Sequence, residues 1–134
     1  MKVVADTNIY VSAIIFGGKP QTILELAHDG LFDLFVSDDI LVETARVLRD
    51  KFHRTPEQLQ ADVMALDALT TRVHPTERIA AVTSDPTDDR ILECAVAAAC
   101  DRIVSGDADL LRMGSFRGIK ILKVSEFLAA FQAR

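Results

Sequence analysis

The stretch Lys2-Val3-Val4-Ala5-Asp6-Thr7-Asn8 decides the fold of this chain. Its first four residues predict a short buried strand, and the unbroken apolar run is typical of a parallel sheet covered on both faces. The pattern from Asn8 to Ile15 then predicts a helix that ends at Gly17-Gly18. In such α/β sheets, ligands bind beyond the carboxyl ends of the strands, which is where Asp6 lies.

The rest of the chain repeats this alternation of short apolar strands with helical patterns. Further strands are expected at Phe32–Val36, Arg72–His74, Arg102–Ser105 and Ile119–Lys123. Helices are expected at Pro20–Asp29, Asp38–Lys51, Pro56–Leu69, Asp88–Ala99, Ala108–Met113 and Ser125–Gln132. We therefore predict an α/β fold, a three-layer α/β/α sandwich with a central, mainly parallel sheet, formed by a single domain over residues 1–134.

The composition is that of a soluble globular domain. The 134 residues are 49% hydrophobic and 26% charged, which supplies a core and excludes disorder as the main state. The apolar runs are far shorter than the roughly 20 residues that a bilayer requires, and the N-terminus has no signal-peptide pattern. Cys94 and Cys100 make no disulfide framework, so we expect a cytoplasmic protein without membrane association.

The net charge is −5, from 20 acidic and 15 basic residues. This balance argues against nucleic-acid binding through a broadly basic surface. It is compatible with an enzyme whose carboxylates hold metal ions, because such a site becomes electropositive only when it is filled.

Acidic residues gather at the carboxyl ends of the predicted strands. Asp6 follows the first strand, and Glu43 lies on the helix after the second. Asp107 follows the strand at 102–105, and Asp88 stands at the start of the alanine-rich helix. The carboxyl ends of parallel strands meet at one edge of a sheet, so we expect these four side chains to converge.

Helix capping is an alternative explanation for some of these acids. Asp85 suits an N-cap position, which would make Asp88 an ordinary first-turn acid, and Asp107 suits the cap of the next helix. Capping does not explain Glu43, which lies inside a helix, three residues after Ile40 and therefore on the core-facing side or its edge. An inward carboxylate is costly unless it is paired, protonated or bound to a metal.

The ligand types indicate which metal such a site would hold. Carboxylates without nearby cysteine or histidine suit Mg²⁺ or Mn²⁺. His28, His53 and His74 share no spacing typical of zinc ligands. A magnesium ion held by acids polarises a phosphodiester and activates water, so the pattern favours hydrolysis of phosphodiesters.

Four segments of the chain, taken in order, resemble the PIN-domain family. They are Asp6-Thr7-Asn8, Leu41-Val42-Glu43-Thr44, Asp85-Pro86-Thr87-Asp88 and Ser105-Gly106-Asp107-Ala108-Asp109-Leu110-Leu111. The resemblance covers essentially the whole chain and is strongest to the VapC-related toxins of toxin–antitoxin systems. It implies an α/β/α fold and a metal-dependent endoribonuclease that leaves 5′-phosphate and 3′-hydroxyl ends.

The resemblance also implies roles for individual residues. Catalysis and binding of Mg²⁺ or Mn²⁺ would fall to Asp6, Glu43, Asp88 and Asp107, with Asp109 as an auxiliary metal ligand. Ligands or water would be oriented by Asn8, Ser12 and Ser105, the last of which replaces the usual Thr. Position 89 is Asp where relatives often have Asn. We prefer Asp88 as the third acid because it stands three residues after Asp85 and faces inward.

Basic residues near the acids are candidates for contacts with the RNA backbone. These candidates are Arg46, Arg49, Arg90 and Arg112, together with Lys51 and Arg54. An equally good interpretation of the run from Arg46 to Arg54 is a solvated helix end that interacts with the helix dipole.

The resemblance implies two protein partners, an antitoxin and a second copy of this chain in a homodimer. An apolar stripe offers packing surface for either partner; its members are Leu59, Val63, Leu66 and Leu69. Ordinary core packing is the simpler interpretation of this stripe.

Three other functions stay open from the residues alone. A PIN-like domain can serve as an inactive binding scaffold, although here all four acid positions are filled. A phosphatase resembling the haloacid dehalogenases needs a second acid two residues after the first, where this chain has Asn8. It also needs a suitably placed lysine, and none is evident in the sequence. A receiver-like signalling module would need an acidic pair after the first strand and a central aspartate.

Overall fold

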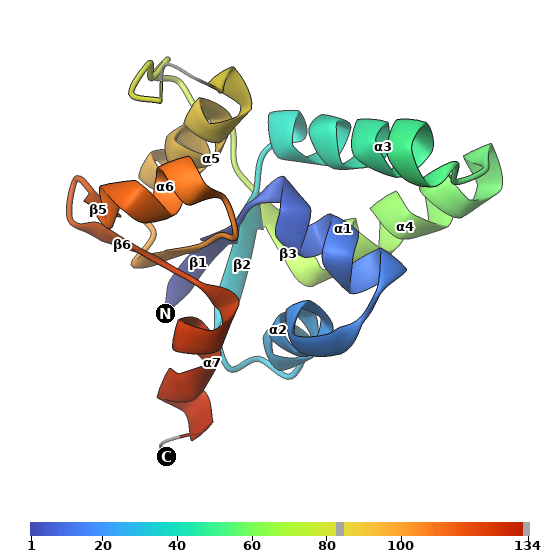
Figure 1. Cartoon of the computed structure of the whole chain (residues 1–134), viewed down its shortest axis with the longest axis horizontal. Coiled ribbons are helices and arrows are strands. Elements are labelled where there is room, and N and C mark those ends of the chain that lie inside the picture. The colour runs from blue at the N-terminus through green and yellow to red at the C-terminus, as the bar shows by residue number, and fades with distance from the viewer. Residues whose placement is uncertain (83–84, 133–134) are drawn as a thin grey trace.

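The computed structural model describes residues 1–82 and 85–132 (Figure 1). The strands are β1 (Lys2–Ala5), β2 (Asp33–Val36), β3 (Thr70–Arg72), β4 (Arg102–Val104), β5 (Ser115–Phe116) and β6 (Ile119–Leu122). The helices are α1 (Thr7–Ile15), α2 (Gly18–His28), α3 (Asp38–Phe52), α4 (Pro56–Leu69), α5 (Pro86–Ala97), α6 (Ala108–Met113) and α7 (Val124–Gln132).

The strands form one sheet in the order β3-β2-β1-β4-β6-β5. All neighbouring pairs are parallel except β5 with β6. β1 lies between β2 and β4, and its residues Val3, Val4 and Ala5 are completely buried. The chain leaves β1 toward β2 and leaves β4 toward β6, so the strand order reverses between β1 and β4. In open α/β sheets, a crevice forms at such a reversal.

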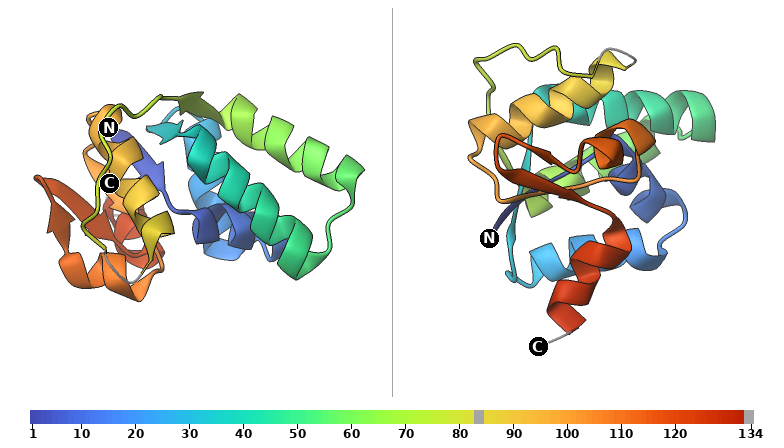
Figure 2. Two further views of the ribbon diagram at one scale, coloured as in Figure 1. Left: turned by 90° about the horizontal axis from the view of Figure 1, so that it is seen from above. Right: turned by 60° about the vertical axis from the view of Figure 1, so that its left-hand side comes forward.

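Helices cover both faces of the sheet. α1 and α2 connect β1 to β2 on one side, whereas α5 and α6 lie on the other side (Figure 1). α5 packs against β1 and β2, and α7 packs against α2. Figure 2 shows α3 and α4 lying side by side. The predicted α/β/α sandwich with a mainly parallel sheet is confirmed.

Several element boundaries differ from the sequence prediction. The third strand is Thr70–Arg72 rather than Arg72–His74, because it is a half-exposed edge strand with little apolar pattern. The alanine-rich helix begins at Pro86, with Asp85 as its N-cap, and ends at Ala97. The two-residue strand β5 has no sequence pattern, because pairing across the Arg117-Gly118 turn creates it.

The stripe on α4 is only partly core. Leu66 is buried, whereas Leu59, Val63 and Leu69 are half-buried. Met64, on the same helix, is 64% exposed. Along the described ranges, no helix combines the length and apolar character that crossing a membrane requires.

Tyr10 on α1 gives the first testable prediction. Its side chain is fully buried, and its hydroxyl has no hydrogen-bond partner among the described residues. Burial raises the pKa of this hydroxyl far above its usual value, so it stays neutral. A buried polar group without a partner costs stability, so Tyr10→Phe is expected to raise the free energy of unfolding by about 1 kcal/mol. Urea denaturation measures this change. A loss of stability in Tyr10→Phe would show that the hydroxyl does have a hydrogen-bond partner in the folded protein.

Candidate metal centre

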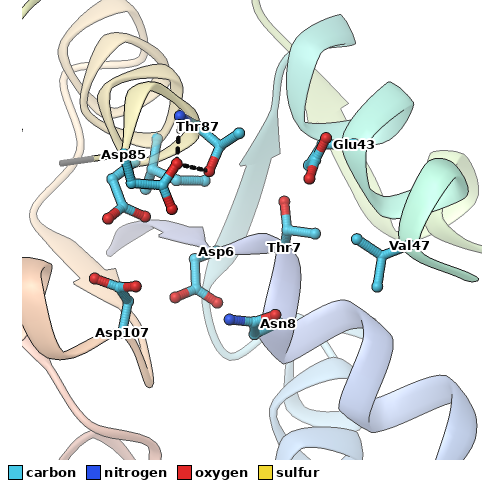
Figure 3. Close-up of a pocket in the computed structure, with 10 residues that line it drawn as sticks. Asp6, Thr7, Asn8, Glu43, Val47, Asp85, Thr87 and Asp107 are labelled. Carbon is cyan, nitrogen blue, oxygen red and sulfur yellow. Dashed lines mark hydrogen bonds between the residues drawn. The ribbon is translucent and has the colours of Figure 1, made fainter. Parts of the chain in front are cut away.

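A cavity of about 140 Å³ lies beyond the carboxyl ends of β1 and β4, where the strand order reverses. Figure 3 shows side chains from several elements around it. The lining residues are Asp6, Thr7, Asn8, Glu43, Val47, Asp85, Thr87, Asp88, Ile91 and Asp107. The fold therefore brings to one cavity the four acids that the sequence analysis singles out.

Asp6 is fixed by three groups around its carboxylate. Its Oδ1 accepts a hydrogen bond from the backbone N–H of Ile9 at 3.1 Å, which caps α1. Its Oδ2 accepts from the Ser105 hydroxyl and, at 3.3 Å, from the Gly106 N–H. Burial raises the pKa of Asp6, and the hydrogen bond from Ser105 opposes this effect. Ser105 therefore links the end of β4 to the acid that follows β1.

Asp107 reaches the cavity from the loop after β4. Its Oδ1 accepts from the backbone N–H groups of Asp109 at 2.9 Å and Leu110 at 3.1 Å, so Asp107 caps α6. Its own N–H donates to the Ser105 hydroxyl oxygen at 2.9 Å. Ser105 thus contacts both Asp6 and Asp107 and fixes them relative to each other.

Three carboxylates in the cavity lie close enough to share one cation. Asp85, Asp88 and Asp107 each offer an oxygen, and these atoms lie within 4.8 Å of one another. Asp88 is buried, and its Oδ2 has no hydrogen-bond partner in the described part of the chain. Burial first, and the neighbouring Asp107 carboxyl second, raise the pKa of Asp88 to about 8. Such crowded carboxylates must be protonated or bind a cation, and their oxygens suit Mg²⁺ or Mn²⁺.

Asp85 is predicted from the sequence only as a helix cap. In the structure it both caps α5 and lies beside two other carboxylates of the cavity. Asp85 Oδ1 accepts from the Thr87 N–H at 3.0 Å and from its hydroxyl at 2.6 Å, as an N-cap does. The same side chain belongs to the three-carboxylate group. Its spacing of three residues before Asp88 would have revealed this proximity.

Glu43 lies on the α3 side of the cavity, apart from the three-carboxylate group (Figure 3). Both of its carboxylate oxygens accept from Arg46 one turn later, at 2.6 and 2.9 Å. Glu43 is therefore a partly exposed acid at the edge of the core, with its charge compensated by its own helix.

The remaining candidate ligands divide into two groups. Asn8 lines the cavity, whereas Ser12 and Asp109 are absent from its described lining. Asp109 forms an ion pair with Arg112 at 2.8 Å. Asp89 Oδ1 accepts from the backbone N–H groups of residues 81 and 82, at 2.9 and 2.8 Å, so Asp89 serves the preceding loop. Asp88, not Asp89, faces the cavity.

All five candidate RNA-binding arginines are paired with acids. Arg46 pairs with Glu43, Arg49 with Asp50, Arg54 with Asp62, Arg90 with Glu93 and Arg112 with Asp109. Arg46, Arg49 and Arg112 are more than half exposed. Lys51 lies over the ring of Phe52.

Comparison with known proteins places this site in context. A sequence model described as the PIN domain matches residues 2–109. The fold is similar to VapBC2 from Rickettsia felis, crystallised with a DNA fragment from their promoter, with a TM-score of 0.64 and 18% identity over 92% of this chain and 98% of that one. It is also similar to PAE2754 from Pyrobaculum aerophilum, with a TM-score of 0.63 and 11% identity over 100% of both chains. Comparison with curated protein sequences finds no match.

Crowding of the carboxylates makes Asp88→Asn a test of the centre. Without divalent cations, this change removes a buried acid that its neighbours repel, so the variant should melt a few degrees higher than the unaltered protein. With Mn²⁺, the order should reverse, because only the unaltered protein gains from binding. Thermal unfolding in EDTA and in Mn²⁺ measures both effects.

Asp89→Asn is the matched control, because the neighbouring Asp89 carboxylate points to the loop and its amide retains an acceptor oxygen. This control should keep the Mn²⁺ response. Equal behaviour of the two variants would show that the Asp88 carboxylate does not contribute to cation binding.

Proposed function

The chain belongs to the PIN-domain family, and on this premise we propose that it is an endoribonuclease dependent on Mg²⁺ or Mn²⁺. The observation that carries the proposal is the group formed by Asp85, Asp88 and Asp107 at the reversal of the strand order. The buried Oδ2 of Asp88, which has no hydrogen-bond partner within residues 1–82 and 85–132, supports a cation there, because a hard divalent ion suits crowded carboxylate oxygens.

We propose that Asp85, Asp88 and Asp107 hold the metal together with Asp6, which lines the same cavity, and that Glu43 lies opposite them. When bound, a divalent ion supplies Lewis-acid polarisation of the phosphodiester and a lowered pKa for water. Ser105 keeps Asp6 oriented and Asn8 offers amide donors at the cavity wall. Asp109 stands two residues after Asp107 and would act only as an auxiliary ligand, and Ser12 would act from the turn of α1 that follows Asn8.

Hydrolysis requires a water oxygen to bond to phosphorus as the bond to the 3′ oxygen breaks. The departing 3′ oxygen takes up a proton from solvent, which leaves 5′-phosphate and 3′-hydroxyl ends. The water proton needs an acceptor, and a carboxylate of the cavity is the available group. We assign this part to Glu43, because it lines the cavity apart from the three crowded acids.

We also propose that the protein is the toxin of a toxin–antitoxin pair and forms a homodimer. The order of its four motifs and the fold that it shares with VapBC2 support this role. The half-buried residues of the α4 stripe and the exposed Met64 offer apolar surface to a partner.

The phosphatase alternative fits the cavity less well. Its second acid would stand at position 8, where Asn8 lines the cavity, and none of the lining residues described is a lysine. The RNA cleavage experiment described next distinguishes an inactive scaffold from a nuclease.

The first experiment is cleavage of a panel of structured and single-stranded RNAs by the purified protein. We expect cleavage with Mg²⁺ or Mn²⁺, none with EDTA, and a loss of about 100-fold or more in Asp6→Asn, because removing a direct metal ligand exceeds the effect of a supporting group. Asp33→Asn, exposed at the opposite end of the sheet, is the charge-matched control and should cleave normally.

Cleavage that survives Asp6→Asn would point to a contaminating nuclease. An absence of cleavage by a folded protein that also fails to bind Mn²⁺ would favour the scaffold role.

Ser105 provides a second test through its support of two acids. Ser105→Ala removes the hydroxyl that contacts Asp6 and Asp107, and the affinity for Mn²⁺ is expected to fall about tenfold, as for other supporting groups of metal sites. Ser105→Thr keeps the hydroxyl and should restore the affinity. Calorimetric titration with Mn²⁺ measures this, and unchanged affinity in Ser105→Ala would exclude the supporting role.

A further inference from the structure

A buried carboxylate on α5 holds two arginines next to the candidate metal centre. The Glu93 side chain is 2% exposed. Its Oε1 lies 3.3 Å from Nη1 of Arg78 and 3.0 Å from Nε of Arg90. Its Oε2 accepts from the backbone N–H of Ile79 at 2.8 Å. A single oxygen therefore forms ion pairs with two guanidinium groups, although the Nε of Arg90 has no hydrogen-bond partner among the described residues.

Two guanidinium groups share one buried carboxylate, so Glu93 alone compensates only one of their two positive charges. The nearest additional acid is Asp39 on α3, 3.8 Å from Arg78 and 54% exposed, which makes it a weak, solvent-screened counterion. Arg90 is also held by the backbone oxygen of Ile79, at 3.2 Å from Nη2. These contacts hold Arg90 in place before any ligand arrives, which lowers the entropic cost of binding an anion.

A hollow of about 190 Å³ lies between α3 and α5, beside these arginines. It lies beside the candidate metal cavity and shares four lining residues with it, namely Thr7, Glu43, Thr87 and Ile91. Arg90 lines the hollow, and Asp39, Ile40 and Val42 complete it. A polynucleotide with one phosphate at the carboxylates would thus pass the arginines with a neighbouring nucleotide.

Other arginines near the cavity lack this arrangement. Arg46 pairs with Glu43 and Arg112 pairs with Asp109, so each has an acid that it does not share with the other arginines of the cavity. Arg90 is 21% exposed and shares its acid with Arg78. Arg78 lies in the loop after β3, where no sequence pattern distinguishes it.

We propose that Arg90 and Arg78 form a binding site for an RNA phosphate adjacent to the one that is cleaved. The identity of this anion as RNA rests on the proposed function. The site explains how a chain of net charge −5 can hold a polyanion, because a small cluster of fixed cations replaces a broadly basic surface.

The test is the salt dependence of RNA binding by the full chain. Fluorescence anisotropy with a labelled, mixed-sequence, single-stranded RNA is recorded in Mn²⁺ at low temperature, and gels verify that the RNA stays intact. Arg90→Gln should weaken binding about tenfold and reduce the slope of log K against log salt by about 0.7, the value for one phosphate contact on a single strand. Arg78→Gln, an exposed substitution that should fold normally, should weaken binding several-fold.

Two further variants sharpen the test. Asp39→Asn removes the acid that competes for Arg78, so RNA binding should tighten. Arg102→Gln removes one positive charge at the opposite end of β4 and should leave the salt slope unchanged.

Normal RNA binding by both Arg90→Gln and Arg78→Gln would overturn the proposal, as would an equal loss in Arg102→Gln, which would indicate diffuse attraction. If the unaltered protein binds Mn²⁺ in calorimetry but no RNA, the phosphate site is wrong and the metal centre stands. If it binds RNA through these arginines but no Mn²⁺, the phosphate site stands and the proposed nuclease activity is wrong.

Discussion

The parallel pairing of β1 with β4 is the constraint on which the site depends. It brings together two acids from opposite ends of the sequence, Asp6 and Asp107, and places Ser105 between them. The backbone N–H of Asp6 donates to the oxygen of Val104 at 3.0 Å, so the pairing continues past the end of β1. A sheet that reverses its strand order at this point leaves the crevice open, and the helices supply the other walls.

Much of the site was predictable because its residues sit where backbone geometry fixes them. The end of a buried strand can be identified from an apolar run, and the residue after it must lie at the edge of the sheet, as Asp6 and Asp107 do. Helical spacing likewise predicts the inward position of Asp88, since it depends only on residues of one helix.

The rest depended on contacts between segments that sequence spacing does not reveal. The carboxylates of Asp89 and Glu93 hold the backbone of residues 79–82, a loop without periodic pattern. The pairing of Glu43 with Arg46 is a choice among rotamers, and the absence of Ser12 from the described cavity lining follows from the direction of one helical turn. The sequence predicts Asp85 only as a helix cap, because its proximity to the carboxylate of Asp107 depends on the packing of α5 against the loop after β4.

Three of the cavity acids, Asp6, Asp85 and Asp107, are also the N-caps of α1, α5 and α6. Asparagine and serine cap helices about as well as aspartate does, but neither supplies a negative oxygen. A descendant of this sequence can therefore replace these aspartates one at a time by asparagine or serine. Each helix would keep its N-cap, and only the affinity for cations would be lost. The architecture thus gives evolution an inexpensive route from an enzyme to a binding protein, along which the fold is preserved at each step.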